Sequence, residues 1–257
     1  MNHGLTSTGI NVICVKWGSK YGPEYVNRLY TMVDRNLDTP FTFYCYTDDA
    51  TGLIPEVNMI NIPKDNDLEV WWNKLPLFKA GMFEGTCLYF DVDVVIQNNI
   101  TPLLQYLDPT KLTKIKTYWK LHKPSYRHYD PIKPLYSFDT TNNSSVMLWV
   151  AGTMEHIWDH FNENPDYYVI RYAGIDRFID HEGFAVNHFP RGLIYSRALG
   201  IDESRSGPVI NNKEQVVLFY DPKYMICIFN TFGDKISLKY GIYTTKDAYK
   251  GFEKYWT

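Results

Sequence analysis

Short apolar runs alternate with helical patterns along the first half of the chain. Asn11–Lys16 (NVICVK) and Phe41–Tyr46 (FTFYCY) are rich in β-branched and aromatic residues, which is typical of buried strands. Between them, Pro23 and Glu24 open a helix that is expected to run to Asn36. Proline costs nothing in a first helical turn and an acid suits the helix dipole there, so the pattern predicts a strand, a helix and a second strand.

The same alternation continues to the middle of the chain. Val57–Ile62 predicts a third, weaker strand, and Asn73 is expected to cap a helix over Lys74–Phe83. Cys87–Phe90 (CLYF) predicts another strand, which runs into two acidic residues. This order predicts an α/β fold with one mostly parallel, mixed central sheet that is flanked by helices. Three polar segments follow predicted strands, at the sheet edge where such folds bind ligands: Lys16–Tyr21, Thr47–Asp49 and Asp91–Asp93.

The second half of the chain is less regular, and we expect residues 108–136 to form a loop. The remaining predicted elements are a strand at Val146–Val150, helices at Thr153–Phe161 and Gly174–His181, strands at Val216–Tyr220 and Met225–Phe229, and a last helix that begins at Thr244 or Thr245. No repeat or linker is evident, which predicts a single domain over residues 1–257.

Composition and charge restrict the classes of function. A net charge of −3 argues against a protein whose main task is to coat nucleic acid, so a nucleic-acid partner is not expected. The first residues carry no basic and apolar signal pattern, and no stretch approaches the length of a membrane span. We therefore expect a cytoplasmic protein with no stable membrane anchor. The four cysteines lie in apolar runs and predict buried thiols: Cys14, Cys45, Cys87 and Cys227.

Two carboxylates follow the predicted strand at Cys87–Phe90. Asp91 and Asp93 are two residues apart, so their side chains project to the same face if the strand continues. Two like charges at the edge of an apolar core are costly unless a cation lies between them. Mg²⁺ or Mn²⁺ is the expected partner, since hard divalent ions prefer oxygen ligands and bridge to diphosphates. An acidic strand end that simply faces water is the alternative interpretation of so short a motif.

The run Asn73–Leu104 (NKLPLFKAGMFEGTCLYFDVDVVIQNNITPLL) resembles the core of glycogenin and its relatives in glycosyltransferase family eight. The resemblance implies a GT-A fold and a nucleotide-sugar donor, with UDP favoured. It also implies that Asp91 and Asp93 bind the metal, that Val92 lies near the ribose, and that Lys74 reaches the donor phosphate or sugar.

The resemblance extends to other parts of the chain. It implies that Tyr21 stacks on the base, and packing of Tyr21 on the following helix is the alternative. Asn143-Ser144-Ser145-Val146-Met147 resembles the strand that lines the donor sugar, and Gly174-Ile175-Asp176-Arg177 resembles a segment near the reacting carbon. Asp176 and Lys74 are therefore the candidate catalytic residues. The candidate nucleotide-sugar-binding residues are Val15, Lys16, Trp17, Tyr21, Asp48, Lys74, Asp91, Val92, Asp93, Asn143, Ser144 and Lys223.

One departure from the family pattern affects the metal. The segment that usually supplies a histidine ligand is here Val216–Lys223, which contains no histidine. Tyr220 or Asp221 could substitute, or water could fill the position. Lys223 could take over part of the cation's work on the diphosphate.

Two other groups of residues could form sites. His156 and His160 have the spacing of a helical zinc pair, but the apolar residues of that helix predict a different inward face, so both histidines are expected to point to solvent. No third ligand is evident. Between Lys111 and Lys133, basic residues alternate with aromatics; this segment could hold an acidic acceptor or nucleic acid, or be a solvated loop.

The sequence thus predicts a metal-dependent glycosyltransferase that moves a hexose from a nucleoside-diphosphate sugar to a hydroxyl of a glycan, lipid or protein. The resemblance suggests retention of anomeric configuration. It also makes residues 1–107 the nucleotide-binding half and residues 108–257 the half that would hold the donor sugar and the acceptor. The alternatives are a binding module that holds the nucleotide-sugar or a glycan without turnover and, further off, a nucleic-acid-binding protein.

Overall fold

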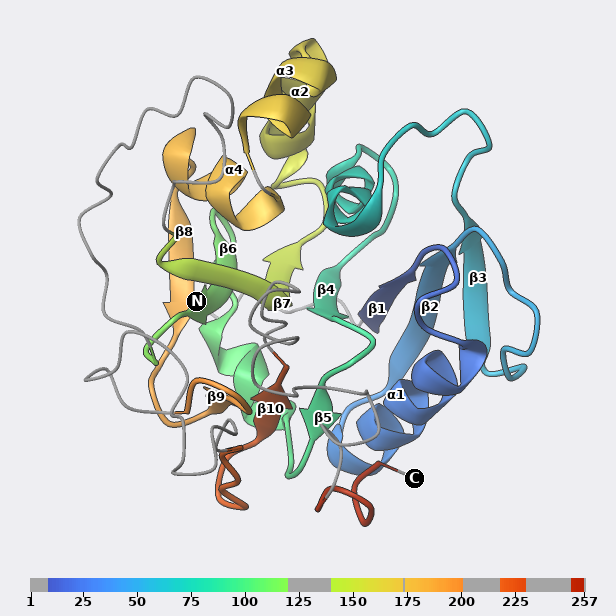
Figure 1. Ribbon diagram of the computed structural model, residues 1–257, viewed down its shortest axis with the longest axis vertical. Coiled ribbons are helices and arrows are strands. Elements are labelled where there is room, and N and C mark those ends of the chain that lie inside the picture. Colours follow the sequence, from blue (N-terminus) through green and yellow to red (C-terminus); the bar gives the residue numbers. More distant parts are fainter. Residues whose placement is uncertain (1–8, 120–139, 173, 201–217, 230–250, 257) are drawn as a thin grey trace, which may run out of the picture.

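A seven-stranded mixed sheet forms the centre of the molecule (Figure 1). This computed structural model describes residues 9–119, 140–172, 174–200, 218–229 and 251–256. The strand order is β3-β2-β1-β4-β7-β6-β8. The strands are β1 (Ile10–Lys16), β2 (Phe41–Thr47), β3 (Val57–Asn61), β4 (Thr86–Phe90), β6 (Leu112–Lys116), β7 (Asn142–Val150) and β8 (Val186–Phe189).

Four of the six neighbouring strand pairs are parallel, and β7 is antiparallel to both of its neighbours, β4 and β6. The first four strands in the order, β3, β2, β1 and β4, all run the same way. Their carboxyl ends therefore meet at one edge of the sheet, where α/β proteins bind ligands. The predicted α/β fold class is confirmed.

The alternation of side chains along each strand fills a separate core on each face of the sheet. Val12 and Cys14 belong to one core and Ile13 to the other; Leu88 and Tyr89 divide in the same way. Helix α1 (Pro23–Asn36) covers the first face. The second face is covered by η1 (Val70–Phe78), α2 (Glu155–Glu163), α3 (Pro165–Arg171) and α4 (Ile175–His181).

A small second sheet joins distant parts of the chain. It has the order β5-β10-β9, with bounds Val95–Ile96, Ile226–Ile228 and Ile194–Ser196. Its residues and the short helix η2 (Thr101–Tyr106) extend the core on the α1 face. In Figure 1 this sheet lies at the end of the molecule opposite to α2, α3 and α4.

The helix predicted over Lys74–Phe83 is wrong in both type and bounds. The chain forms the 3₁₀-helix η1 from Val70 to Phe78, with Pro76 inside it. Proline has no N–H to donate and its ring clashes with the carbonyl four residues back, which disfavours an α-helix here. Asn73, the predicted cap, is buried and donates instead to the carbonyl oxygen of Leu68 at 3.0 Å.

The loop predicted for residues 108–136 is also partly wrong, because Leu112–Lys116 is the strand β6. Its alternate residues Leu112 and Lys114 are both fully buried, so a lysine occupies a core-facing position that the apolar pattern could not predict. The helix predicted from Thr153 begins at Glu155, and the Thr153 hydroxyl donates to the carbonyl oxygen of Val150.

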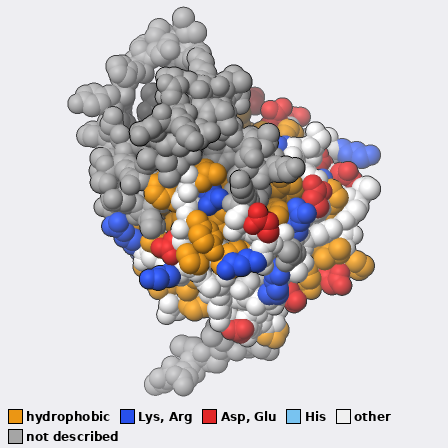
Figure 2. All heavy atoms as spheres, turned by 60° about the horizontal axis from the view of Figure 1, so that its bottom comes forward, with side chains coloured by type: hydrophobic (Ala, Val, Ile, Leu, Met, Phe, Trp, Pro, Cys, Tyr) orange, Lys and Arg blue, Asp and Glu red, His pale blue; other side chains and the backbone are white. Residues whose placement is uncertain are grey.

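Other expectations are confirmed, and some lie outside the described residues. The strand within Met225–Phe229 and the helix after Gly174 are present, and all four cysteines are buried free thiols. Leu218–Tyr220 is not a strand, while residues 216 and 217 and the helix expected from Thr244 or Thr245 are not described. In the described part of the chain, every helix is too short or too polar to cross a membrane. On the face shown in Figure 2, Lys and Arg side chains are interspersed with Asp and Glu.

Candidate active site

The loops that follow β1 and β2 are tied together at the carboxyl edge of the sheet. The Lys16 ammonium donates to the carbonyl oxygen of Asp49 at 3.1 Å. In return, the Asp48 carboxylate accepts from the backbone N–H of Gly18 at 3.0 Å. Gly18 has a φ of +65°, a left-handed conformation that suits glycine and turns this N–H toward the neighbouring loop. Two of the three polar segments noted in the sequence are therefore in contact.

The third segment, after β4, is built around Asp91. Its backbone N–H bonds to the carbonyl oxygen of Ser145 at 2.9 Å, which continues the pairing of β4 with β7. One carboxylate oxygen, Oδ1, lies 2.6 Å from the Lys74 ammonium and accepts the Tyr89 hydroxyl at 2.7 Å. Burial and the Asp91 carboxylate raise the pKa of Tyr89 well above its ordinary value, so Tyr89 is a neutral donor. One carboxylate oxygen of Asp91 is thus bound by both a cation and a hydroxyl.

Asp93 meets the loop after β1. The Tyr21 hydroxyl donates to Asp93 Oδ2 at 2.8 Å, and the Lys20 ammonium lies 4.8 Å from the centre of the Tyr21 ring. Burial, then the charge of Asp91, raises the pKa of Asp93 to about 6, against the lowering effects of Tyr21, Lys20 and Lys74. The two carboxylates are therefore close enough to oppose each other's ionisation, which is the electrostatic condition for a cation between them.

Lys74 connects these carboxylates to β7. Its ammonium lies 3.2 Å from both the backbone oxygen and the hydroxyl oxygen of Ser144, and its residue is only 7% exposed. A buried ammonium needs partners on several sides, and here it has a carboxylate, a carbonyl and a hydroxyl. Lys74 can be reached by a ligand that fits against Asp91, which suits it to hold phosphate or sugar oxygens.

Asp176 forms a second charged pair on the same side of the sheet. Its Oδ1 lies 3.1 Å from the ammonium of Lys114, whose side chain is fully buried, while the Asp176 side chain is 22% exposed. The sequence did not single out Lys114, which it placed in a basic segment with an acceptor-binding or solvated role. Strand alternation from Leu112 is the one signal that could have put this lysine inside.

Asp180 fixes the helix that carries Asp176. Its Oδ2 accepts from the Thr140 hydroxyl at 2.5 Å and from the Thr141 N–H at 2.8 Å, just before β7 begins. Thr140 also reaches the backbone oxygen of Asp176 at 3.5 Å. One turn of α4 is thereby tied to the strand that carries Ser144, so the two charged pairs keep a fixed relation.

The other predicted site residues lie in several different places in the structure. Val15 and Trp17 are half-buried against the core of the η1 face, and Val92 is 4% exposed within the core of the α1 face. Asn143 accepts from the backbone N–H of Ser145 at 2.9 Å. Lys223 donates its N–H to Asp221 and, within the described part of the chain, contacts neither Asp91 nor Asp93. The binding roles of these residues stay predictions.

Tyr220 and Asp221, the two candidates for a third metal ligand, form hydrogen bonds with other residues. The Tyr220 hydroxyl lies 3.2 Å from that of Tyr255, and the Asp221 carboxylate accepts from Lys223. Among the residues that the structure describes, no three His, Cys, Asp or Glu side chains converge on one point. The metal-binding role of Asp91 and Asp93 stays a prediction.

The histidine pair on α2 takes part in a separate polar network. His160 Nε2 lies 2.9 Å from Glu182 and 2.9 Å from the Tyr168 hydroxyl, and the Tyr172 hydroxyl donates to the same Glu182. His156 packs near the ring of Phe184 instead. The expectation that both histidines point to solvent is therefore wrong for His160, which is held by a carboxylate from the end of α4.

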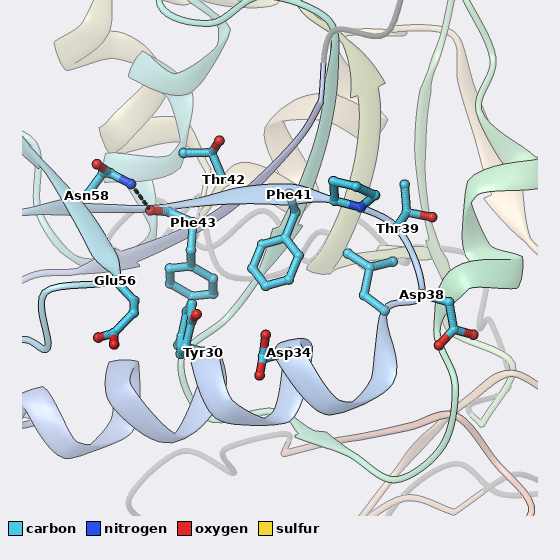
Figure 3. Close-up of a pocket in the computed structure, with 11 residues that line it drawn as sticks. Tyr30, Asp34, Asp38, Thr39, Phe41, Thr42, Phe43, Glu56 and Asn58 are labelled. Carbon is cyan, nitrogen blue, oxygen red and sulfur yellow. Dashed lines mark hydrogen bonds between the residues drawn. The ribbon is translucent and has the colours of Figure 1, made fainter.

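A groove of about 510 Å³ lies at the opposite, amino end of the parallel strands (Figure 3). Tyr30 and Asp34 on α1 face Phe41 and Phe43 on β2 across it, and Glu56 lies beside them. The three acids that line it, Asp34, Asp38 and Glu56, are exposed. This groove has the polar and aromatic composition of a binding surface, but its acidic side chains are exposed to solvent.

Comparison with known proteins shows the fold. No protein-family model matches the chain, and no curated protein is significantly similar to it in sequence. Two crystal structures of the galactosyltransferase LgtC are similar to it, one in complex with donor and acceptor sugar analogues and one of an active-site mutant. Both match with a TM-score of 0.52 over 72% of this chain and 75% of theirs, at 14% and 12% identity respectively. The predicted GT-A architecture is confirmed, whereas a likeness to glycogenin in particular is not shown.

Proposed function

We propose that the protein is a metal-dependent glycosyltransferase that moves a hexose from a nucleoside-diphosphate sugar, with UDP favoured, to a hydroxyl acceptor. The observation that carries this proposal is the pair Asp91 and Asp93 at the carboxyl edge of the sheet, held by Lys74 and Tyr21. The likeness to a galactosyltransferase whose structure holds donor and acceptor sugar analogues supports it.

The residues present fit a divalent metal. The raised pKa of Asp93 reflects carboxylates that repel each other in a partly buried place, and a cation bound between them would remove that cost. Mg²⁺ commonly binds through one or two carboxylates, with the remaining positions filled by phosphate oxygens and water. A bound ion would supply positive charge to the departing diphosphate.

The protein's own residues then have separate tasks. Lys74 would place an ammonium against the donor, next to Asp91, and would stabilise negative charge that grows on the leaving group. Tyr21 would orient Asp93 through its hydroxyl. Its ring packs edge-on against Tyr25 of α1, with the ring centroids 4.8 Å apart, and would offer a face to the base. Asp176 would be the carboxylate nearest to the reacting carbon, oriented by its ion pair with Lys114.

The test is a thermal-shift screen of nucleoside diphosphates and nucleotide-sugars, with Mn²⁺, with Mg²⁺ and with chelator. A ligand at a hundred times its dissociation constant adds about 2.7 kcal/mol to the free energy of unfolding. Stabilisation should require metal and should disappear in Asp93→Ala. Asp34→Ala, which removes an exposed acid of the distant groove, is the matched control and should behave as wild type. If no nucleotide stabilises the wild-type protein under any condition, the proposal is wrong.

A further inference from the structure

An exposed tryptophan stands at the outer end of η1. Trp71 is 45% exposed, whereas its neighbour Trp72 is 5% exposed and stacks on Phe161 in the core. Among the described residues, the Trp71 side chain has no hydrogen bond and no aromatic partner. Trp71 therefore has a large flat surface that a ligand can reach, whereas Trp72 is used in packing.

The backbone before Trp71 is held in an unfavourable conformation. Val70 has a φ of +48°, and it is the one residue other than glycine with a positive φ in the described chain. β-Branched residues rarely adopt the left-handed region, and such strain is kept where surrounding structure demands it, often at binding sites. This turn sets Trp71 outward and Trp72 inward.

Trp71 lies directly over the segment that carries Asp176. A Cβ atom added to Gly174 would come within 2.6 Å of the indole nitrogen of Trp71. Gly174 itself has a φ of +107° and is the residue before α4. Glycine is required there for both reasons, and its lack of a side chain lets the indole lie against the backbone two residues before Asp176.

The same tryptophan is one helical turn from Lys74. Residues three apart in a 3₁₀-helix lie above one another, separated by about 6 Å along its axis. Lys74 is 7% exposed and bound to Asp91, so Trp71 is the outer member of this pair. A donor whose diphosphate reaches Asp91 and Asp93 would lie beside Lys74. The indole of Trp71 is then left for the second substrate, the acceptor.

We propose that Trp71 is the platform on which the acceptor stacks, and that the acceptor presents a pyranose ring there. The apolar C–H face of a pyranose matches a flat aromatic surface, while the ring hydroxyls stay free to reach water and Asp176. A glycan acceptor, or a glycolipid or glycoprotein that presents its sugar, is therefore favoured over a bare lipid or protein hydroxyl. The inference rests on the proposed function.

Saturation-transfer NMR tests this on the whole protein with UDP and Mn²⁺ bound. The probes are maltose, cellobiose and methyl α-mannoside, with the open-chain alditol sorbitol as the control that has hydroxyls but no ring face. Wild type should bind the pyranosides through C–H protons of one ring face and should not bind sorbitol. Trp71→Ala should weaken pyranoside binding about tenfold or more, and Trp71→Phe should be intermediate.

Controls separate this inference from the proposed function. Trp158→Ala removes a half-buried tryptophan of α2 that lies under the Lys79 ammonium, and should leave pyranoside binding unchanged. UDP binding, read from the thermal shift, should be the same in Trp71→Ala and wild type. Unchanged pyranoside affinity in Trp71→Ala, equal binding of sorbitol, or no pyranoside binding to the wild type would overturn the inference while UDP binding stands. Loss of UDP binding by the wild type would overturn the proposed function instead.

Discussion

The two ends of the parallel strands carry similar side chains in opposite surroundings. At the carboxyl end, Asp91 and Asp176 are each paired with a buried lysine ammonium. At the amino end, Asp34, Asp38 and Glu56 line an open groove and stay exposed (Figure 3). Both ends offer carboxylates beside aromatic rings, so residue type alone does not distinguish them.

Desolvation is what separates the two ends. At the carboxyl end, burial and the neighbouring charge raise the pKa of Asp93 to about 6. Charges taken out of water must be matched by partners or by a ligand, and the free energy of that match is available for binding. In the groove, water already solvates the acids, so a ligand there would gain little from them.

The largest effect is expected when the buried pair at the carboxyl end is broken. Asp176→Ala should lower the free energy of unfolding by about 3–5 kcal/mol, because it leaves the fully buried Lys114 ammonium without its partner. Urea denaturation measures this. The double variant Lys114→Met with Asp176→Ala should recover most of the loss, since no unpaired charge remains. If Asp176→Ala lowers the free energy of unfolding by no more than an ordinary surface substitution does, the assignment of Lys114 to the core is wrong.

A pH-dependent effect is expected at Asp93 in the metal-free protein. The folded-state pKa is raised to about 6, so the stability that the neutral carboxyl gives is fully present below about pH 4 and lost as pH rises through 6. Asp93→Asn should therefore be more stable than wild type by about 1–3 kcal/mol at pH 8, with the difference gone near pH 4. Chelator-treated samples compared by calorimetry test this; a difference that does not vary with pH would rule the mechanism out.

A smaller effect is expected at Tyr21, and it separates two roles of the side chain. Tyr21→Phe removes the hydroxyl that donates to Asp93 and should cost about 1 kcal/mol of stability. If the ring stacks on the base, Tyr21→Phe keeps nucleotide affinity, whereas Tyr21→Ala loses about 1–3 kcal/mol of binding. Titration calorimetry with UDP and Mn²⁺ distinguishes them; equal losses in both variants would show that the hydroxyl, not the ring, matters.

The smallest effect is expected in the groove. Asp34→Asn and Glu56→Gln remove exposed charges, and each should change the free energy of unfolding by less than about 0.5 kcal/mol, with no effect on nucleotide binding. The same urea and calorimetric measurements apply. A change as large as that at Asp176 would mean that the contrast between the two ends is not one of desolvation.

The sequence predicted the parallel half of the sheet well because strands such as β1 are mostly apolar and helix α1 has a clear period. It also placed Asp91, Asp93 and Tyr21 at strand ends, and the structure brings these three together. Local patterns were sufficient there because each residue is positioned by the strand directly before it.

One residue that was missed depends on a contact between distant parts of the chain, and the other differences have local causes. Lys114 can be buried because Asp176, 62 residues later, supplies its partner. The residues next to Lys114 in the sequence predict a surface lysine instead. Pro76 changes the type of η1, although the leucines and phenylalanine around it fit a helical period. The contact of Tyr89 with Asp91 could have been predicted from the sequence, because Tyr89 lies two residues before Asp91 on the same strand face.

The position of β7 has a consequence for how the chain is made. β7 lies between β4 and β6, yet it begins more than fifty residues after β4 ends. Until residues 142–150 have left the ribosome, the apolar strand β4 is an open sheet edge, the kind of template on which chains aggregate. A fragment that ends before β7 should therefore be insoluble or depend on chaperones, even though it contains both carboxylates. Residues 1–107 can complete their part of the sheet only with the strand that the second half of the chain provides.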